Sequence, residues 1–230
     1  MHLHAWNSPP TEPLTADDWR HKPYLIEYSD AMMREKVDYM TRLLEDTFQT
    51  KMVSHRAGRW AFDERYARLL VEYGYQVDCS VTPRVNWKTA KGAPQGDGGT
   101  DYRRFPQHAY FLDENDISRE GHSPLLEVPM SIQYKHSAWM NSVKQGYDRL
   151  RGKVRSPSVH WLRPMGGNVE TMKKVVEQTL TQGNDYVEYM LHSSEYMPGG
   201  SPTFQNERDI ERLYADLEAF FSWLAPDRKS

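Results

Sequence analysis

The spacing of hydrophobic residues along the chain predicts four amphipathic helices. Apolar side chains recur at intervals of three and four over residues 34–48 and again over residues 62–73. A third helix is expected after Asn168, and a fourth after Asn206, where acidic residues occupy the first turn. Each helix has one apolar face, so each is expected to pack on other elements.

Short apolar or alternating segments lie between these helices and predict β-strands. They are residues 51–54, 75–81, 125–132, 158–162 and 185–191. Alternation of strands and helices predicts an α/β fold whose sheet is mostly parallel, with helices outside, either open or closed into a barrel. In both forms catalytic groups gather where strands end and loops begin.

One stretch breaks this rhythm. Residues 84–123 contain the Gly- and Pro-rich segment TAKGAPQGDGG, which predicts a long loop insertion rather than a helix or strand. Long ordered loops in compact domains are usually functional or mobile.

Composition narrows the class of protein. A length of 230 residues fits a single domain over residues 1–230. A total of 29 Lys and Arg against 32 Asp and Glu leaves a net charge of −3, which argues against a nucleic-acid partner. Cys79 is the one cysteine, which excludes an internal disulfide framework. No apolar run approaches the ~20 residues of a membrane span, and the first residues do not read as a secretory signal, so a cytoplasmic protein is expected. The oligomeric state is not indicated.

The first candidate site is the segment His2-Leu3-His4. In an extended chain the two imidazoles lie on the same side, with Cβ atoms about 7 Å apart, which suits two ligands of one divalent metal. Zinc also needs a third protein ligand, often a carboxylate. The alternative is a polar N-terminus that is frayed and binds nothing.

The second candidate site is residues 54–60, SHRAGRW, at a predicted strand end. Arg56 and Arg59 beside Trp60 suit a site that holds a carboxylate and stacks on a sugar. The alternative is a surface turn in which Gly58 supplies a positive φ and Trp60 closes the core.

The third candidate is His192, which follows a predicted strand and precedes a Gly- and Pro-rich loop. A histidine at such a position suits a general acid or base. Its serine neighbours do not make a nucleophile motif, because no G-x-S-x-G elbow is present. The alternative is a histidine satisfied by the neighbouring backbone.

In this order the segments resemble the polysaccharide deacetylase superfamily, whose members share a chitooligosaccharide-deacetylase homology domain. The matching segments are HLHAWNSPP, SHRAGRWAFDERYARLLVEYGYQVDCSVTP, LLEVPMS and MLHSSEYMPGGSP. The agreement in order extends over nearly the whole chain. It looks most like bacterial members associated with surface-polysaccharide or O-antigen synthesis.

The resemblance implies a distorted (β/α)7 barrel that hydrolyses an N-acetyl group on a sugar or polysaccharide. His2 and His4 match the histidines that hold a divalent metal, most simply Zn²⁺, with Co²⁺, Ni²⁺ or Mg²⁺ as alternatives. His192 matches the histidine that protonates the leaving amine, and Arg56 matches the arginine that orients the catalytic aspartate.

The resemblance also implies a carbohydrate site with aromatic walls. Trp60 and Trp6 would flank the sugar, with Arg59 beside them. A non-catalytic carbohydrate-binding protein on the same fold, or a deformylase of an amino sugar, are the alternative functions.

The chain departs from the family at its start. The family's aspartate pair lies at the end of a first strand upstream of the histidine motif, and no residue precedes Met1. Two alternatives follow. Either this chain lacks the first strand of the barrel, which predicts an impaired metal site, or a different acid supplies the ligand, with Asp78, Asp101 and Glu195 as the candidates.

Overall fold

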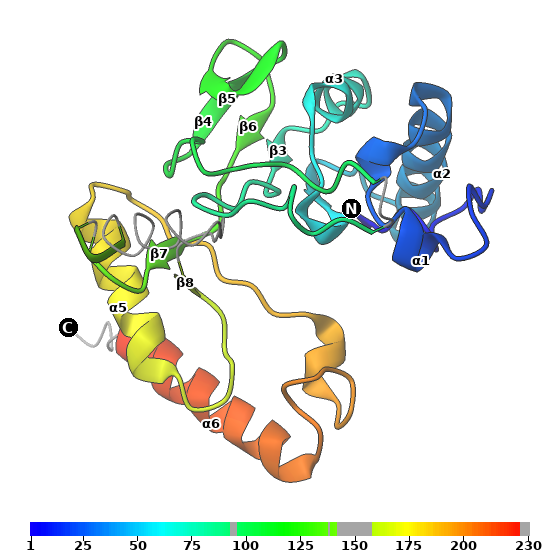
Figure 1. The fold of residues 1–230 in the computed structure, drawn as a ribbon. Coiled ribbons are helices and arrows are strands. Elements are labelled where there is room, and N and C mark those ends of the chain that lie inside the picture. The colour runs from blue at the N-terminus through cyan, green and yellow to red at the C-terminus, as the bar shows by residue number, and fades with distance from the viewer. Residues whose placement is uncertain (93–95, 138, 142–157, 226–230) are drawn as a thin grey trace, which may run out of the picture. The chain divides into compact units, whose positions relative to one another are not determined.

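The structure is a computed structural model that describes residues 1–92, 96–137, 139–141 and 158–225. The chain divides into two compact units, Met1–Pro129 and Met130–Ser230, each of which is described by itself (Figure 1). The single domain expected over residues 1–230 stays a prediction.

The first unit contains a six-stranded sheet with the order β1-β2-β3-β6-β4-β5. Four neighbouring strands run parallel: β1 (His2–Leu3), β2 (Ser54–Ala57), β3 (Val77–Asp78) and β6 (Leu126–Glu127). The other two strands are β4 (Tyr110–Asp113) and β5 (Asp116–Glu120). β4 is antiparallel to both of its neighbours, β6 and β5. The mixed α/β character and the parallel strands agree with the sequence. The (β/α)7 barrel is not confirmed, because the described sheet is open and ends at β1 and β5.

The two long helices of this unit are α2 (Asp30–Phe48) and α3 (Glu64–Glu72). The Ser29 side chain accepts a hydrogen bond from the N–H of Met32, and Asp63 accepts one from the N–H of Tyr66. These caps set the helix starts. The predicted helices over 34–48 and 62–73 are therefore confirmed, with shifted ends. Three short helical turns complete the unit: α1 (Asp18–His21), η1 (Leu25–Glu27) and η2 (Gly58–Trp60).

The predicted loop over residues 84–123 contains the β4–β5 hairpin. Tyr110 and Leu112 are buried while Phe111 between them is 52% exposed, which is the alternation of a half-buried strand. The Tyr110 hydroxyl donates to the Ile117 carbonyl at 2.8 Å and ties the two strands together. The Gly- and Pro-rich start of the segment concealed this pattern.

The hydrophobic core of the first unit gathers side chains from the sheet and both long helices. It includes Leu3 of β1, Val37 of α2, Leu70 of α3 and Leu112 of β4, none of them more than 1% exposed. Because β1 contributes Leu3 to this core, the first residues of the chain are part of the packed structure.

The second unit pairs β7 (Ile132–Tyr134) with β8 (Val159–Trp161) in an antiparallel sheet. Helix α5 (Val169–Thr181) packs on both strands and on α6 (Glu207–Leu224) (Figure 1). Asn206 caps α6 together with Asp209, as its sequence predicts.

The strand predicted over residues 185–191 is wrong. The backbone there bonds to isolated partners, with the N–H of Met190 donating to the Leu162 carbonyl and the N–H of Glu188 donating to the Ser131 hydroxyl. The apolar run is real, but it forms no ladder. Among the described residues, no helix is long and apolar enough to cross a bilayer.

Candidate functional site

Parallel pairing of β1 with β2 brings the predicted site residues together in the first unit. His2 lies opposite Arg56 and Leu3 opposite Ala57, so the segments after both strands leave the same edge of the sheet. The Met1 ammonium donates to the Ser54 carbonyl at 2.6 Å, which fixes β1 further. This pairing contradicts a frayed start of the chain.

His2 and His4 form a close imidazole pair. Their ring centroids are 4.7 Å apart, and the rings meet edge to face at 83°. His2 Nδ1 lies 2.8 Å from the Arg56 carbonyl oxygen, which can only accept, so Nδ1 carries the proton and Nε2 keeps its lone pair. Burial lowers the pKa of His2 to about 4, so the ring is neutral near pH 7.

Gly58 permits this arrangement through the space it leaves. A Cβ atom there would collide with the Leu3 carbonyl oxygen and would lie only 2.8 Å from His4 Nδ1. The φ angle of Gly58 is outside the left-handed region. Glycine is therefore required here because β1 approaches so closely, and not because of the backbone conformation.

The next two residues adopt left-handed backbone conformations. Arg59 has φ 53° and Trp60 has φ 59°, which costs non-glycine residues roughly 1–3 kcal/mol each. The Tyr102 hydroxyl, from a fully buried side chain, donates to the Trp60 carbonyl at 2.6 Å and holds the turn. Consecutive residues held in this region indicate a turn shaped for function.

Two arginine–tryptophan pairs flank the imidazoles. The Arg59 guanidinium lies 5.1 Å from the Trp6 ring centre, and the His4 ring lies 4.6 Å from it. The Arg56 guanidinium lies 5.4 Å from the Trp60 ring centre. The structure thus brings together all the predicted site residues except His192. Among the described residues Arg56 has no carboxylate partner, so the aspartate it was expected to orient is not seen.

The His2–His4 pair fits a metal in donor type but not in number. Among the residues that the structure describes, no three His, Cys, Asp or Glu side chains gather at metal-ligand spacing. The three expected substitutes have other partners: Asp78 bonds to His55, Asp101 pairs with Arg103 at 2.6 Å, and Glu195 pairs with Arg163 at 2.6 Å.

A buried polar network supports the strand edge beneath the site. His55 Nδ1 lies 2.5 Å from Asp78 Oδ1, and His55 Nε2 lies 2.7 Å from the Tyr66 hydroxyl. The Ser80 hydroxyl donates to Asp78 at 2.9 Å and accepts from the N–H of Ala57 at 2.8 Å. Burial lowers the pKa of His55 and the Asp78 carboxylate opposes that shift. This network was missed because its members meet only through the pairing of β2 with β3.

His192 belongs to the second unit and is oriented by a buried carboxylate. Its backbone N–H donates to Glu195 Oε2 at 2.9 Å, and its Nδ1 lies 3.1 Å from the same oxygen. Glu195 is 2% exposed, and its other oxygen accepts from Arg163 Nη2 at 2.6 Å. Glu195 lies in the turn η3 (Ser193–Tyr196) that follows His192. The imidazole is half exposed, so Nε2 is left to exchange a proton.

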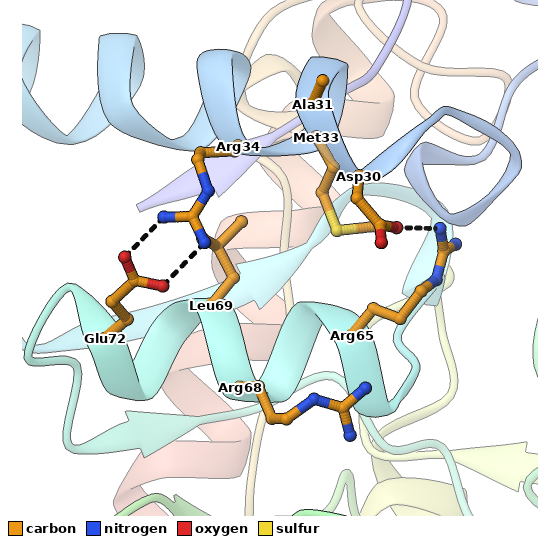
Figure 2. A pocket seen from close by; sticks show the side chains of 8 residues that line it. All are labelled: Asp30, Ala31, Met33, Arg34, Arg65, Arg68, Leu69 and Glu72. Atoms are coloured by element: carbon orange, nitrogen blue, oxygen red, sulfur yellow. Dashed lines mark hydrogen bonds and ion pairs between the residues drawn. The ribbon is translucent and has the colours of Figure 1, made fainter.

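A separate pocket of about 410 Å³ lies between α2 and α3 (Figure 2). Arg34 makes two hydrogen bonds to Glu72, at 2.5 and 2.7 Å, and Arg65 bonds to Asp30 at 2.7 Å. Its acidic side chains are thus already paired, and its lining includes no imidazole or nucleophile. We interpret these ion pairs as contacts that join the two helices.

Comparison with known proteins adds little to this geometry. No family model matches the chain, and no curated protein matches it. Among solved structures it is similar to a crystal structure assigned to a polysaccharide deacetylase from Mycobacterium smegmatis, with 16% identity and a TM-score of 0.47. The match covers 89% of this chain and 54% of that chain, so this chain spans about half the length of its structural relative. The functional argument therefore rests on the residues themselves.

Proposed function

We propose that the protein is a metal-dependent carbohydrate deacetylase that hydrolyses the N-acetyl group of a sugar. The observation that carries this proposal is the His2–His4 pair, 4.7 Å apart, with His2 Nδ1 held by the Arg56 carbonyl. A histidine whose Nδ1 donates to a backbone carbonyl presents Nε2 to a metal, as metal-ligating histidines commonly do.

In this proposal His2 and His4 hold a divalent cation, Zn²⁺ first, with Co²⁺, Ni²⁺ or Mg²⁺ as alternatives. A bound cation of this kind polarises a carbonyl and acidifies a water molecule. Trp6 and Trp60 each have an arginine over the ring, and aromatic rings of this kind can stack on a sugar. Arg56 and Arg59 hold these rings in place and supply hydrogen-bond donors.

His192 is proposed to protonate the leaving amine. Glu195 accepts from Nδ1, which fixes the tautomer in which Nε2 faces outward. Arg163 in turn holds Glu195, so the carboxylate keeps its orientation. Glu195 is therefore a positioning residue for His192.

The proposed substrate is a polysaccharide or its precursor in bacterial surface-glycan synthesis, such as O-antigen. Support for this subgroup comes from the order of the sequence motifs alone. A panel of N-acetylated and N-formylated sugars tests which acyl group the protein removes, because a deformylase would release formate and leave acetyl groups intact.

A second candidate function is non-catalytic carbohydrate binding. It is favoured by one observation, namely that no third metal ligand joins the two histidines among the described residues. A binding protein would keep the Trp6 and Trp60 surfaces without needing a metal.

Metal content separates these two functions. The purified protein is reconstituted with Zn²⁺, dialysed and measured by elemental analysis, alongside His2→Ala, His4→Ala and the control His108→Ala, whose ring pairs with Glu120 on the β4–β5 hairpin. The deacetylase proposal expects near-stoichiometric zinc in the wild type and the control, and loss of zinc in the other two. Equal, negligible zinc in all four proteins would favour the binding function.

A further inference from the structure

A second pocket lies directly beside the candidate site and shares a wall with it. It has a volume of about 370 Å³, and its lining includes Trp6, whose ring also contacts His4. Small-molecule sites typically measure roughly 300–1,000 Å³, so this pocket can enclose a sugar ring. Nothing in the proposed deacetylation uses this space.

The pocket is lined by two tryptophans. Trp6 is half-buried, while Trp19 from α1 is 51% exposed. A large aromatic side chain left half in water beside a pocket is typical of a binding surface. Flat apolar rings of this kind pack on the apolar faces of sugar rings and attract cations.

The charged groups of the pocket are mainly acidic. Glu12, Asp17 and Asp18 line it, against the single cation Lys36. Lys36 is 1% exposed and donates to the backbone carbonyls of Ser8 and Pro10, at 2.7 and 2.5 Å. Its charge also interacts with Asp18 and Glu12.

The carboxylates differ in what they can still bind. Burial raises the pKa of Asp18, but hydrogen bonds, chiefly from Thr15 and Leu14, lower it by more and keep the side chain ionised. Asp17 caps α1 and lies 3.6 Å from the exposed Arg20. Glu12 is exposed and has no hydrogen-bond or ion-pair partner among the described residues. Arg20 and Lys36 offset part of the negative charge of the pocket, and the exposed Glu12 carboxylate is left to face a cationic ligand.

We propose that this pocket binds an amino sugar residue carrying a free, protonated amine. The sugar ring packs on Trp19 and Trp6, and the ammonium group faces Glu12, with Asp17 and Asp18 in the same lining. An acidic sugar would be repelled by these carboxylates, and an N-acetylated sugar would gain no charge interaction. The inference rests on the proposed function, since it places a deacetylated sugar next to the site that removes acetyl groups. It makes the substrate a glycan in which acetylated and free amino sugars are neighbours.

Binding of a glucosamine dimer tests this inference without turnover. Calorimetric titration in the presence of a chelator compares the glucosamine dimer with the N,N′-diacetylated dimer. The wild type is expected to bind the free amine more tightly. Trp19→Ala should weaken that binding about tenfold, in line with the loss of aromatic and cation–π contact. Glu12→Gln, which keeps the shape of the side chain, should remove most of the preference for the free amine.

Trp139→Ala is the matched control, because Trp139 is 74% exposed and belongs to the second unit. It should bind the dimer as the wild type does. The inference is overturned if the wild type does not bind the glucosamine dimer, if Trp19→Ala binds it equally well, or if both dimers bind alike. Because no catalysis is measured, retained binding in a protein that releases no acetate would refute the proposed function alone. Acetate release without dimer binding would refute the pocket alone.

Discussion

At the scale of single residues, the candidate site depends on a glycine that is required by space. Gly58→Ala would drive a Cβ atom into the Leu3 carbonyl and the His4 ring. We expect the free energy of unfolding to fall by about 1–3 kcal/mol, the usual cost of overpacking, and metal affinity to fall with it. Chemical denaturation and zinc titration measure the two effects.

Gly74→Ala is the control for that change. Gly74 has φ 80° but nothing within 4 Å of an added Cβ, so it tests backbone strain without a collision. Its substitution should cost about 1–2 kcal/mol of stability and leave metal affinity unchanged. A Gly58→Ala protein with wild-type zinc affinity would show that the close approach does not position His4.

The buried His55 predicts how stability depends on pH. Burial lowers the pKa of His55 below its usual value of 6.5, and the charges of Arg56 and the Met1 amino group act in the same direction, although Asp78 opposes the shift. The unfolded chain therefore takes up a proton below pH 6.5 that the folded protein does not. Stability should fall as the pH drops from about 7.5 to about 5, measured by denaturant unfolding at each pH.

His55→Gln should reduce the slope of this part of the pH profile, and the lowered pKa of His2 accounts for slope that remains. Tyr66→Phe is the matched control: it removes the hydroxyl 2.7 Å from His55 Nε2 but keeps the imidazole, so it should lower stability while preserving the slope. Identical slopes in the wild type and His55→Gln would contradict the assignment of the titration to His55.

Single residues differ in how far the sequence alone could predict them. The same-side placement of His2 and His4 follows from the two-residue period of a strand, and the structure has it. The partner of His192 was in reach too, since Glu195 lies three residues on, in a short turn. Arg163 was not, because its contact with Glu195 spans 32 residues and leaves no local pattern.

At the scale of elements, one arginine joins the starts of α2 and α3. Arg65 bonds to Asp30 and Asp63 and also donates to the carbonyls of Ile26 and Tyr28 (Figure 2 shows the Asp30 contact). Arg65→Ala leaves these acceptors unpaired and should lower the free energy of unfolding by about 1–3 kcal/mol, measured by denaturant unfolding.

Arg34→Ala is the comparison, because Arg34 lies on the same pair of helices but makes an exposed pair with Glu72. Exposed ion pairs add little stability, so this variant should lose much less than Arg65→Ala. If both variants lost the same amount, the backbone contacts of Arg65 would not be the reason for its effect.

Elements were predictable where local periodicity is strong. The helices over 34–48 and 62–73 were recovered because each has an apolar stripe at helical spacing. Their starts were less predictable, because these are set by the caps Ser29 and Asp63. Residues 185–191 show the reverse case: an apolar run cannot tell a strand from extended chain, because the difference is whether a neighbouring backbone completes the ladder.

At the scale of the whole molecule, the proposed reaction assigns the proton donor to His192. His192→Ala should lower kcat by about 10²–10⁴-fold while leaving zinc content unchanged, because a proton donor is lost but no metal ligand. Glu195→Gln should lower kcat less and shift its pH profile, since His192 keeps its ring but loses its anionic partner. Steady-state acetate release across pH measures both, and kcat within a few-fold of wild type in His192→Ala would refute the assigned role.

The sequence predicted the α/β class of the fold, but not whether its sheet closes into a barrel. Alternation of strands and helices predicted a largely parallel sheet, and β1, β2, β3 and β6 are parallel neighbours. This alternation left open whether the sheet closes, and the (β/α)7 barrel came from the family resemblance, whereas the described sheet is open. Whether edge strands meet depends on contacts between distant segments, which no local pattern records.

We propose that His2 and His4 hold a divalent cation with which the protein removes an acetyl group from a sugar. Acetate release from an N-acetylated oligosaccharide, by one protein sample first treated with chelator and then reloaded with Zn²⁺, tests it most directly. We expect chelation to abolish acetate release, Zn²⁺ to restore it, and Zn²⁺ to have no such effect on His2→Ala and His4→Ala. Release that persists in the chelated protein, or no release from the zinc-loaded wild type, would contradict it.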